Sequence, residues 1–323
     1  MADLHGNAPC GWHDGPVIVV LAPGQGSQTP GFLDPWLAEP GARETLERWS
    51  EQAGTDLVAH GTTSDADAIR DTAVAQPLIV AAGLLTARAL FSRVDRSLVA
   101  GVAGHSVGEF TAAAVAGVLD EDDAVALVAE RGRAMADAAA EAPTGMSAVL
   151  GGDEAELEAR LAELGLAPAN HNGGGQVVVA GPLEALASLA EQPPARARVV
   201  PLAVAGAFHT RYMASAVERL RAAAAPLAVQ DPTTTLWTNA DGSAVASGPA
   251  FVDLLVGQVS SPVRWDAVMR SLQESGVTGL VELAPAGALT GLAKRGLKGV
   301  PCVAVKTPDD LAAAVDLLEG ATS

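Results

Sequence analysis

Positive charge is scarce in this chain. Its 323 residues include 20 lysines and arginines against 38 aspartates and glutamates, a formal net charge of −18. Nucleic-acid binding depends on a basic surface that neutralises phosphates, so this balance argues against that class of protein. An acidic partner would need a local basic cluster. Lys294, Arg295 and Lys298 form one, but they are equally well explained as a helix end, where cations suit the helix dipole.

Cysteine is almost absent as well. The chain has two cysteines, Cys10 and Cys302, too few for a disulfide framework. Cys302 lies in an apolar, strand-like run, so we expect it to be structural rather than reactive. The sequence has no CxxC or HExxH motif and no cluster of histidines, so we expect no metal site.

Long hydrophobic runs are missing too. No uninterrupted apolar stretch reaches the roughly 18 residues that a membrane-spanning helix requires, so we expect no membrane partner. Residues 1–15 lack the charged and then apolar layout of a signal peptide, and we predict a disordered extension and a cytoplasmic protein. Aromatic residues make up only 3% of the chain, yet 49% of it is hydrophobic, which predicts a globular protein of one or two domains.

The most informative stretch surrounds Ser106. Residues 99–103 predict a buried strand, residues 109–116 predict a helix, and Gly104-His105-Ser106-Val107-Gly108 between them fits the G-x-S-x-G nucleophile elbow. In such an elbow the glycines avoid Cβ clashes at a tight turn, and the serine hydroxyl lies near the N-terminus of the helix. Three fixed positions are a weak signal alone, so an ordinary turn with an inert serine is the alternative.

A second glycine-rich segment follows the first predicted strand. Residues 16–22 are apolar, and residues 23–31 then contain three glycines and two prolines. The spacing fits neither a dinucleotide fingerprint nor a Walker A loop. The segment is therefore either a plain loop or an oxyanion loop that serves the serine elbow.

One arginine stands on an apolar helix face. Asp120 is a predicted N-cap, and Arg131 shares a face of the following helix with Leu127, Val128 and Met135. Burying an unpaired charge is costly. Arg131 is therefore either a surface residue that extends its charged end into water or a pocket arginine that binds a carboxylate.

A general base for Ser106 must come from elsewhere in the chain. Outside the N-terminal segment the histidines are His60, His105, His171 and His209. His209 is the best placed, because the chain returns there from a predicted insertion to the larger domain. A purely structural histidine remains the alternative.

Strands alternate with helices along the chain, which predicts an α/β fold with a mostly parallel sheet. We expect a large α/β-hydrolase-like domain formed by residues 16–145 and 210–323, and a small ferredoxin-like domain inserted at 146–209. In the insertion we predict three strands and two helices in the order β-α-β-α-β, with residues 170–175 as a loop. In the first part we predict helices at 43–53, 65–72 and 76–90, the last with Pro77 near its first turn.

Five motifs occur in one order along the chain. They are Pro23–Gln28, Gly104–Glu109, Arg131-Gly132, Gly206-Ala207-Phe208-His209, and Gln258 with Ser261–Trp265 after it. Together they resemble the malonyl-CoA:acyl carrier protein transacylases of fatty-acid synthesis. The resemblance covers nearly everything after residue 16, and five ordered motifs are far more specific than any one of them.

The resemblance implies a mechanism. His209 would take the proton of Ser106, which attacks malonyl-CoA to form a malonyl-serine, and the N–H groups of Gln25 and Val107 would stabilise the oxyanion. The backbone of Gln258 would orient His209. The phosphopantetheine thiol of an acyl carrier protein would then accept the malonyl group. No further cofactor and a monomeric enzyme are implied.

The resemblance also implies a substrate preference. Arg131 would bind the free malonyl carboxylate in a bidentate fork, and His105 would line the substrate site. In related polyketide acyltransferases a phenylalanine at the position of Phe208 accompanies malonyl. Two departures stand out: Gly206 replaces a histidine of the polyketide motif, and Ala284-Pro285-Ala286 replaces Gly-Pro-Gly.

Other functions remain open on the sequence alone. A free-standing polyketide acyltransferase could use the same residues with malonyl or another acyl group. A serine hydrolase or thioesterase shares the elbow, and a non-enzymatic carrier-binding protein is the least specific alternative. The sequence does not identify the carrier protein or the pathway.

Overall fold

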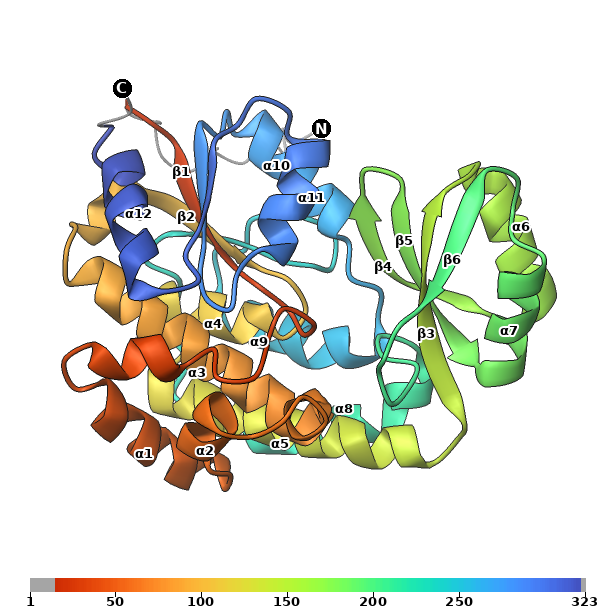
Figure 1. The fold of residues 1–323 in the computed structure, drawn as a ribbon, viewed down its shortest axis with the longest axis horizontal. Coiled ribbons are helices and arrows are strands. Elements are labelled where there is room, and N and C mark those ends of the chain that lie inside the picture. The colour runs from red at the N-terminus through yellow and green to blue at the C-terminus, as the bar shows by residue number, and fades with distance from the viewer. Residues whose placement is uncertain (1–14, 321–323) are drawn as a thin grey trace, which may run out of the picture.

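Two β-sheets, each with its own helices, organise this protein (Figure 1). The structure is a computed structural model and describes residues 15–320. Residues 1–14 of the predicted N-terminal extension, which include Cys10, lie outside the described residues. The larger sheet is parallel and the smaller one is antiparallel, so the predicted combination of a mostly parallel sheet with a small separate sheet is confirmed.

The parallel sheet has the strand order β7-β2-β1-β8-β9. Its strands are β1 (Ile18–Ala22), β2 (Val99–Gly104), β7 (Thr235–Trp237), β8 (Gly279–Glu282) and β9 (Cys302–Ala304). Every residue of the central strand β1 is buried. A strand buried on both faces is typical of a parallel sheet covered by helices on each side.

The alternation of side chains along β1 divides the core into two layers. Ile18 and Val20 pack on one face with residues of α3 (Thr72–Phe91), α4 (Gly108–Val115) and α12 (Leu311–Leu318). Val19 and Leu21 pack on the other face with residues of α10 (Trp265–Glu274) and α11 (Ala288–Gly296). The helices are α1 (Ala42–Ala53), α2 (Leu57–Thr62), α3 (Thr72–Phe91), α4 (Gly108–Val115), α5 (Glu121–Ala140), α8 (Ala214–Ala224), α9 (Gly248–Gly257), α10 (Trp265–Glu274), α11 (Ala288–Gly296) and α12 (Leu311–Leu318).

The long helix α3 corrects two predictions. It begins at Thr72, where the Asp71 carboxylate accepts the N–H of Ala73, so Pro77 lies within the helix rather than near its first turn. The helix predicted at 65–72 is wrong. Only the short 3-10 helix η2 (Ala68–Arg70) forms there, because the Asp65 carboxylate accepts backbone N–H groups and favours a turn.

Helix α3 is also apolar enough to resemble a membrane span. Among the described residues it is the one helix whose length and composition pass such a test, with a mean hydropathy of 1.6 over its 18-residue window. In the structure 83% of that window is buried. Its all-round hydrophobicity is thus matched by packing against α4 and α5.

The antiparallel sheet has the order β4-β5-β3-β6. Its elements are β3 (Thr144–Gly151), α6 (Glu154–Leu164), β4 (Ala167–Gly173), β5 (Gln176–Pro182), α7 (Leu183–Glu191) and β6 (Ala197–Pro201). The βαββαβ succession with this strand order is the ferredoxin-like arrangement. Helices α6 and α7 cover one face of the sheet, and the other face turns toward the parallel sheet (Figure 1).

The loop predicted at 170–175 is wrong, because strand β4 continues to Gly173. Its residues lack the β-branched side chains that mark strands, so the sequence gives no local signal. Two pairings hold the strand in place. One is antiparallel to β5, and the other joins the N–H of His171 to the carbonyl of Val263, 2.8 Å away. Tertiary pairing therefore overrides local propensity here.

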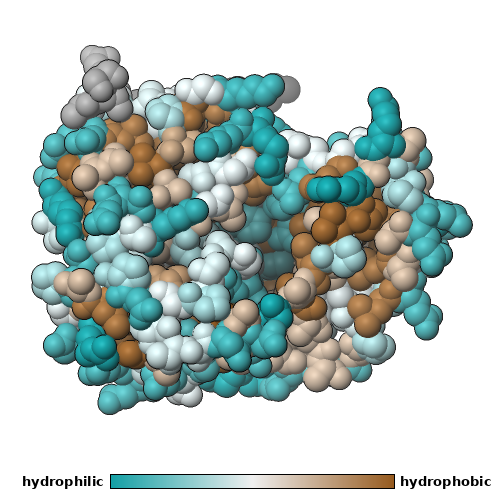
Figure 2. All heavy atoms as spheres, in the orientation of Figure 1, coloured by the Kyte–Doolittle hydropathy of each residue, from teal (hydrophilic) through white to brown (hydrophobic). Residues whose placement is uncertain are grey.

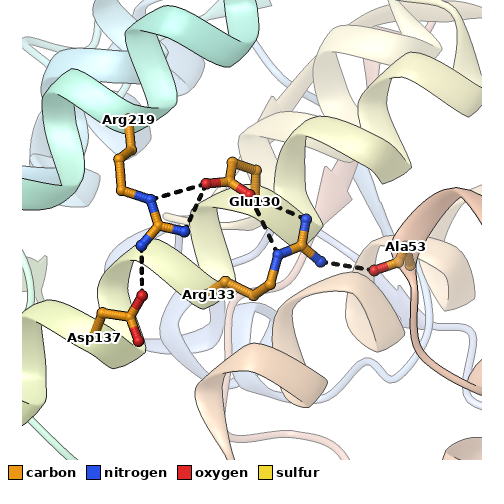
Figure 3. A network of polar contacts seen from close by, with 5 residues as sticks. All are labelled: Ala53, Glu130, Arg133, Asp137 and Arg219. Carbon is orange, nitrogen blue, oxygen red and sulfur yellow. Dashed lines mark hydrogen bonds and ion pairs between the residues drawn. The ribbon is translucent and has the colours of Figure 1, made fainter.

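A network of polar contacts connects helices α1, α5 and α8 (Figure 3). Glu130 on α5 accepts hydrogen bonds from Arg219 on α8, at 2.8 and 3.0 Å, and from Arg133, at 3.1 and 3.3 Å. Arg133 also donates to the carbonyl of Ala53 at the end of α1, and Arg219 donates to Asp137. Glu130 is thus the shared acceptor of the network.

We expect Glu130→Ala to lower the free energy of unfolding by about 1 kcal/mol, because two arginines lose their acceptor. Urea denaturation at low salt and at about 1 M NaCl checks this, and the loss should shrink at high salt. Glu218→Ala is the control. Glu218 on α8 is 81% exposed with Arg221 at 3.9 Å, so its loss should stay under about 0.5 kcal/mol. Equal losses for the two variants would contradict the role given to Glu130.

Candidate functional site

Ser106 lies at a sharp turn between β2 and α4. Its φ is +53°, an uncommon value for a residue other than glycine. The flanking glycines are sterically required: a Cβ on Gly104 would lie 2.1 Å from the carbonyl carbon of Gly108, and one on Gly108 would lie 2.2 Å from the carbonyl oxygen of Ala22. The local geometry is that of a nucleophile elbow.

His209 meets the serine. Its Nε2 is 2.7 Å from Ser106 Oγ, and its Nδ1 is 2.8 Å from the backbone carbonyl oxygen of Gln258. A carbonyl can only accept, so Nδ1 carries the proton and Nε2 is free to accept one from the hydroxyl. Within residues 15–320, no carboxylate contacts this imidazole.

The environment of His209 keeps the ring neutral. The residue is 4% exposed, and burial together with the positive charge of Arg131 lowers its pKa to about 3. Both effects disfavour the imidazolium. At physiological pH the ring is therefore in the form that can accept the serine proton.

Arg131 is fully buried, with an exposed fraction of 1%, so the surface alternative is wrong. Its guanidinium donates to Gln76 Oε1 at 2.5 Å and to Gln258 Oε1 at 2.9 Å, and Nη2 is 3.5 Å from Ser106 Oγ. Among the described residues, no acceptor forms a hydrogen bond with its Nε. Burial lowers its pKa to about 10, which still leaves it charged at neutral pH. A buried cation whose direct partners are neutral amides is suited to an anionic ligand.

The two expected oxyanion donors border the same cleft. Gln25 and Val107 both line it beside Ser106. Within the described part of the chain, neither backbone N–H has a hydrogen-bond partner, whereas the neighbouring N–H of Ser106 bonds to Asn239. The side chain of Gln25 accepts a hydrogen bond from Thr72 at 3.0 Å, which anchors the loop. Two backbone N–H groups without a partner in the described part of the chain therefore belong to residues that line the cleft beside Ser106.

Two residues under the elbow, Asn239 and Glu109, were assigned no role from the sequence. Asn239 accepts the N–H of Ser106 at 2.7 Å and donates to the carbonyl of Gly104 at 2.7 Å. Its own N–H donates to Glu109 Oε1 at 2.7 Å. A signal did exist, since Asn239 follows β7 at the carboxyl end of a parallel strand, where polar site residues gather.

His105 and Phe208 complete the expected set, and both line the cleft. His105 Nε2 is 2.9 Å from Asn172 Oδ1 at the end of β4, and its ring packs edge-on against Trp265. Burial lowers the pKa of His105. Its contact with Asn172 joins the elbow to the antiparallel sheet.

The cleft has a volume of about 480 Å³ and lies between the two sheets. Figure 2 shows a hollow there, with hydrophobic surface over the antiparallel sheet beside it. The antiparallel sheet and the segment that follows β6 contribute apolar residues to the lining of the cleft, namely Met146, Ala148, Val178, Leu202 and Val204. Within residues 15–320, no group of three His, Cys, Asp or Glu side chains is arranged to hold a metal ion.

The basic cluster of Lys294, Arg295 and Lys298 has features of both a helix end and a binding site for an acidic group. Lys294 and Arg295 stand in the last turn of α11, as the helix-end explanation requires. Arg295 also lines the cleft, and its Nη2 donates to Gln176 Oε1 at 3.0 Å. Arg295 therefore provides a positive charge at the cleft itself.

Comparison with known proteins identifies the family of the chain. Residues 19–313 match the acyl transferase domain family. A Mycobacterium tuberculosis (strain H37Rv) protein named malonyl CoA-acyl carrier protein transacylase is 56% identical over 299 residues, 91% of this chain and 98% of that protein. The Escherichia coli K12 protein of the same name is 34% identical over 302 residues, 91% of this chain and 97% of that one.

Solved structures give the same result. A crystal structure of MCAT from Mycobacterium tuberculosis has a TM-score of 0.90 at 56% identity, covering 93% of this chain and 99% of that one. A malonyl-transacylase in complex with a type II PKS acyl-carrier protein has a TM-score of 0.88 at 31% identity, with coverage of 93% and 99%. The chain belongs to the malonyl-CoA:acyl carrier protein transacylase family and is an acyltransferase.

Proposed function

We propose that this protein transfers the malonyl group of malonyl-CoA to the phosphopantetheine thiol of an acyl carrier protein through a malonyl-Ser106 intermediate. One observation carries the proposal: Ser106 Oγ is 2.7 Å from His209 Nε2 and 3.5 Å from Nη2 of the buried Arg131. A nucleophile, a base and a fixed positive charge thus share one cleft. The names of the relatives support the same substrate pair.

In the first half-reaction His209 accepts the proton of Ser106 as Oγ attacks the thioester carbon. The oxyanion points to the N–H groups of Gln25 and Val107, each of which contributes about 2.7–4 kcal/mol in comparable enzymes. His209 then protonates the departing thiolate of coenzyme A. The carbonyl of Gln258 stabilises the imidazolium without a third, acidic residue.

Arg131 selects the acyl group. The malonyl thioester ends in a carboxylate that the guanidinium can bind through two hydrogen bonds. Acetyl-CoA has no such group and would leave the guanidinium without an anionic partner in the cleft. Phe208 narrows the cleft beside His209, which disfavours a branched acyl group.

In the second half-reaction the carrier thiol enters the space vacated by coenzyme A. His209 accepts its proton, the thiolate attacks the carbonyl carbon of the serine ester, and the bond from that carbon to Ser106 Oγ breaks as His209 returns the proton to Oγ. The reaction needs no cofactor beyond the phosphopantetheine that the carrier brings. The complex of a 31% identical relative with a polyketide carrier supports a carrier protein as partner, and both fatty-acid and polyketide carriers are substrates to test.

Brief exposure to malonyl-CoA should add the mass of one malonyl group to the wild type and none to Ser106→Ala. Intact-protein mass spectrometry measures this directly. The adduct should persist in water until a holo carrier protein is added, because transfer requires a thiol. An adduct on Ser106→Ala would refute the malonyl-serine, and rapid loss in water without a carrier would indicate a hydrolase.

Arg131→Ala should lower the acylation efficiency with malonyl-CoA relative to acetyl-CoA by about 10- to 150-fold, because a hydrogen bond to a charged group is worth about 1.5–3 kcal/mol. Single-turnover acylation with each thioester gives the ratio. Arg133→Ala is the matched control, since Arg133 is on the same helix but faces the network of Figure 3. An unchanged ratio in Arg131→Ala would remove Arg131 from substrate selection.

The acylation rate at saturating malonyl-CoA should stay constant within about twofold from pH 8 to pH 5. The pKa of His209 is lowered to about 3, so the neutral base persists across this range. A histidine with the ordinary pKa near 6.5 would lose about thirtyfold in rate by pH 5. Quenched-flow acylation measured against pH distinguishes the two, and an acid limb centred near pH 6.5 would contradict the neutral, buried base.

A further inference from the structure

One buried carboxyl group has no part in the proposed chemistry. Glu109, the second residue of α4, is 1% exposed and lies beneath the elbow. Its Oε1 accepts the N–H of Asn239 at 2.7 Å, and its Oε2 accepts from Gln258 Nε2 in a close contact. Both oxygens therefore act as acceptors, as they do in an ionised carboxylate.

Gln258 links this carboxylate to the substrate-selecting cation. Its Oε1 accepts from Arg131 Nη2 at 2.9 Å, while its Nε2 donates to Glu109. An amide has one acceptor end and one donor end, so this orientation requires a donor on the arginine side and an acceptor on the glutamate side. A buried cation and a buried carboxyl group are thus joined through a single amide.

The surroundings of Glu109 contain few other charges. Arg131 on α5 is the cation that acts on it, and His209 contacts the far side of Gln258 as a neutral ring. Asn239 and Thr238, which follow β7, are neutral. Strands β1 and β2 carry no charged residue, and the one charged residue of α3, Arg88, pairs with Glu121. Among these charged neighbours, Arg131 is therefore the one that stabilises the ionised form of Glu109.

Burial works against that ionised form. It raises the pKa of Glu109 to about 8, against the opposing effects of Asn239, Arg131 and Gln258. The group therefore changes charge within the range in which the protein can be studied. Any further negative charge near Arg131 shifts it toward the protonated form.

We propose that Glu109, where it is ionised, is the internal counter-charge of Arg131 and takes up a proton from solvent when the malonyl carboxylate reaches Arg131. The inference rests on the proposed contact between malonyl and Arg131. Two carboxylates then compete for one buried guanidinium, and the interior cannot hold the second charge without a partner. Glu109 gains one proton to become a neutral acid, and no bond of the substrate changes. Glu109 is a positioning residue, because it acts through Gln258 and Arg131.

Coupling between malonyl-CoA binding and the protonation of Glu109 determines how the affinity for malonyl-CoA changes with pH. Above about pH 8 Glu109 is ionised in the free protein, so malonyl-CoA must bind together with a proton. The affinity for malonyl-CoA relative to acetyl-CoA should then fall about tenfold from pH 7 to pH 9. Acetyl-CoA carries no carboxylate at this end and should bind without proton uptake.

Isothermal titration calorimetry on the Ser106→Ala protein tests the proposal, because acylation cannot occur there. Titrations with malonyl-CoA at about pH 8, in phosphate and in Tris, should show uptake of about half a proton per site, since half of Glu109 is ionised. Acetyl-CoA is the matched ligand control and should show none. The same experiment with Ser106→Ala/Glu109→Gln should abolish the uptake, and Glu109→Asp should restore part of it.

A second measurement avoids a substitution at Glu109, whose change to glutamine could disturb folding. In the Ser106→Ala protein, the ratio of the two affinities is measured from pH 7 to pH 9. Equal proton uptake in the Glu109→Gln variant, or a ratio that is flat with pH, would overturn the proposal. Malonyl-CoA that binds no more tightly than acetyl-CoA at pH 7, or equally well to Arg131→Ala, would instead overturn the proposed substrate contact.

Discussion

The buried guanidinium of Arg131 is the constraint on which the rest of the site depends. A charge taken out of water needs polar partners, and here they come from four different segments. Gln76 on α3 and Gln258 after α9 contact the guanidinium directly, Ser106 lies 3.5 Å away, and the carboxyl group of Glu109 is joined to it through Gln258. Helix α5 carries the arginine and packs against α3, α4 and α8, which brings these segments together.

The topology of the parallel sheet explains why these segments meet. Ser106 follows β2, Gln25 follows β1 and Asn239 follows β7, three neighbouring strands that run in one direction. The carboxyl ends of parallel strands lie at one edge of the sheet, so their loops converge there. The antiparallel sheet then closes the site from the other side, where Asn172 holds His105.

The sequence predicted that Ser106, His209 and Arg131 lie in one site, because each has a local signature or a position in an ordered set of motifs, and the structure brings the three together. The predicted strands at 16–22 and 99–103 and the predicted helices at 43–53 and 109–116 match observed elements to within two residues at each end. Strand β4 was missed because its pairing to Val263 depends on contacts distant in sequence, and η2 was mistaken for a helix because aspartate side chains compete for its N–H groups. Glu109 and Asn239 could not be connected from sequence, since their contact spans 130 positions.

The charge pattern of the site explains why a carbonyl, and not a carboxylate, orients His209. A carboxylate at Nδ1 would raise the pKa of the ring and add a second anion near Arg131, where it would compete with the substrate for the same guanidinium. The Gln258 carbonyl fixes the tautomer without adding charge, while the side chain of the same residue connects Arg131 to Glu109. One glutamine therefore contacts both the imidazole and the guanidinium, and the carboxyl group of Glu109 contacts its side-chain amide rather than the imidazole. The proposed function, which holds an anionic acyl group beside a neutral base, favours this separation.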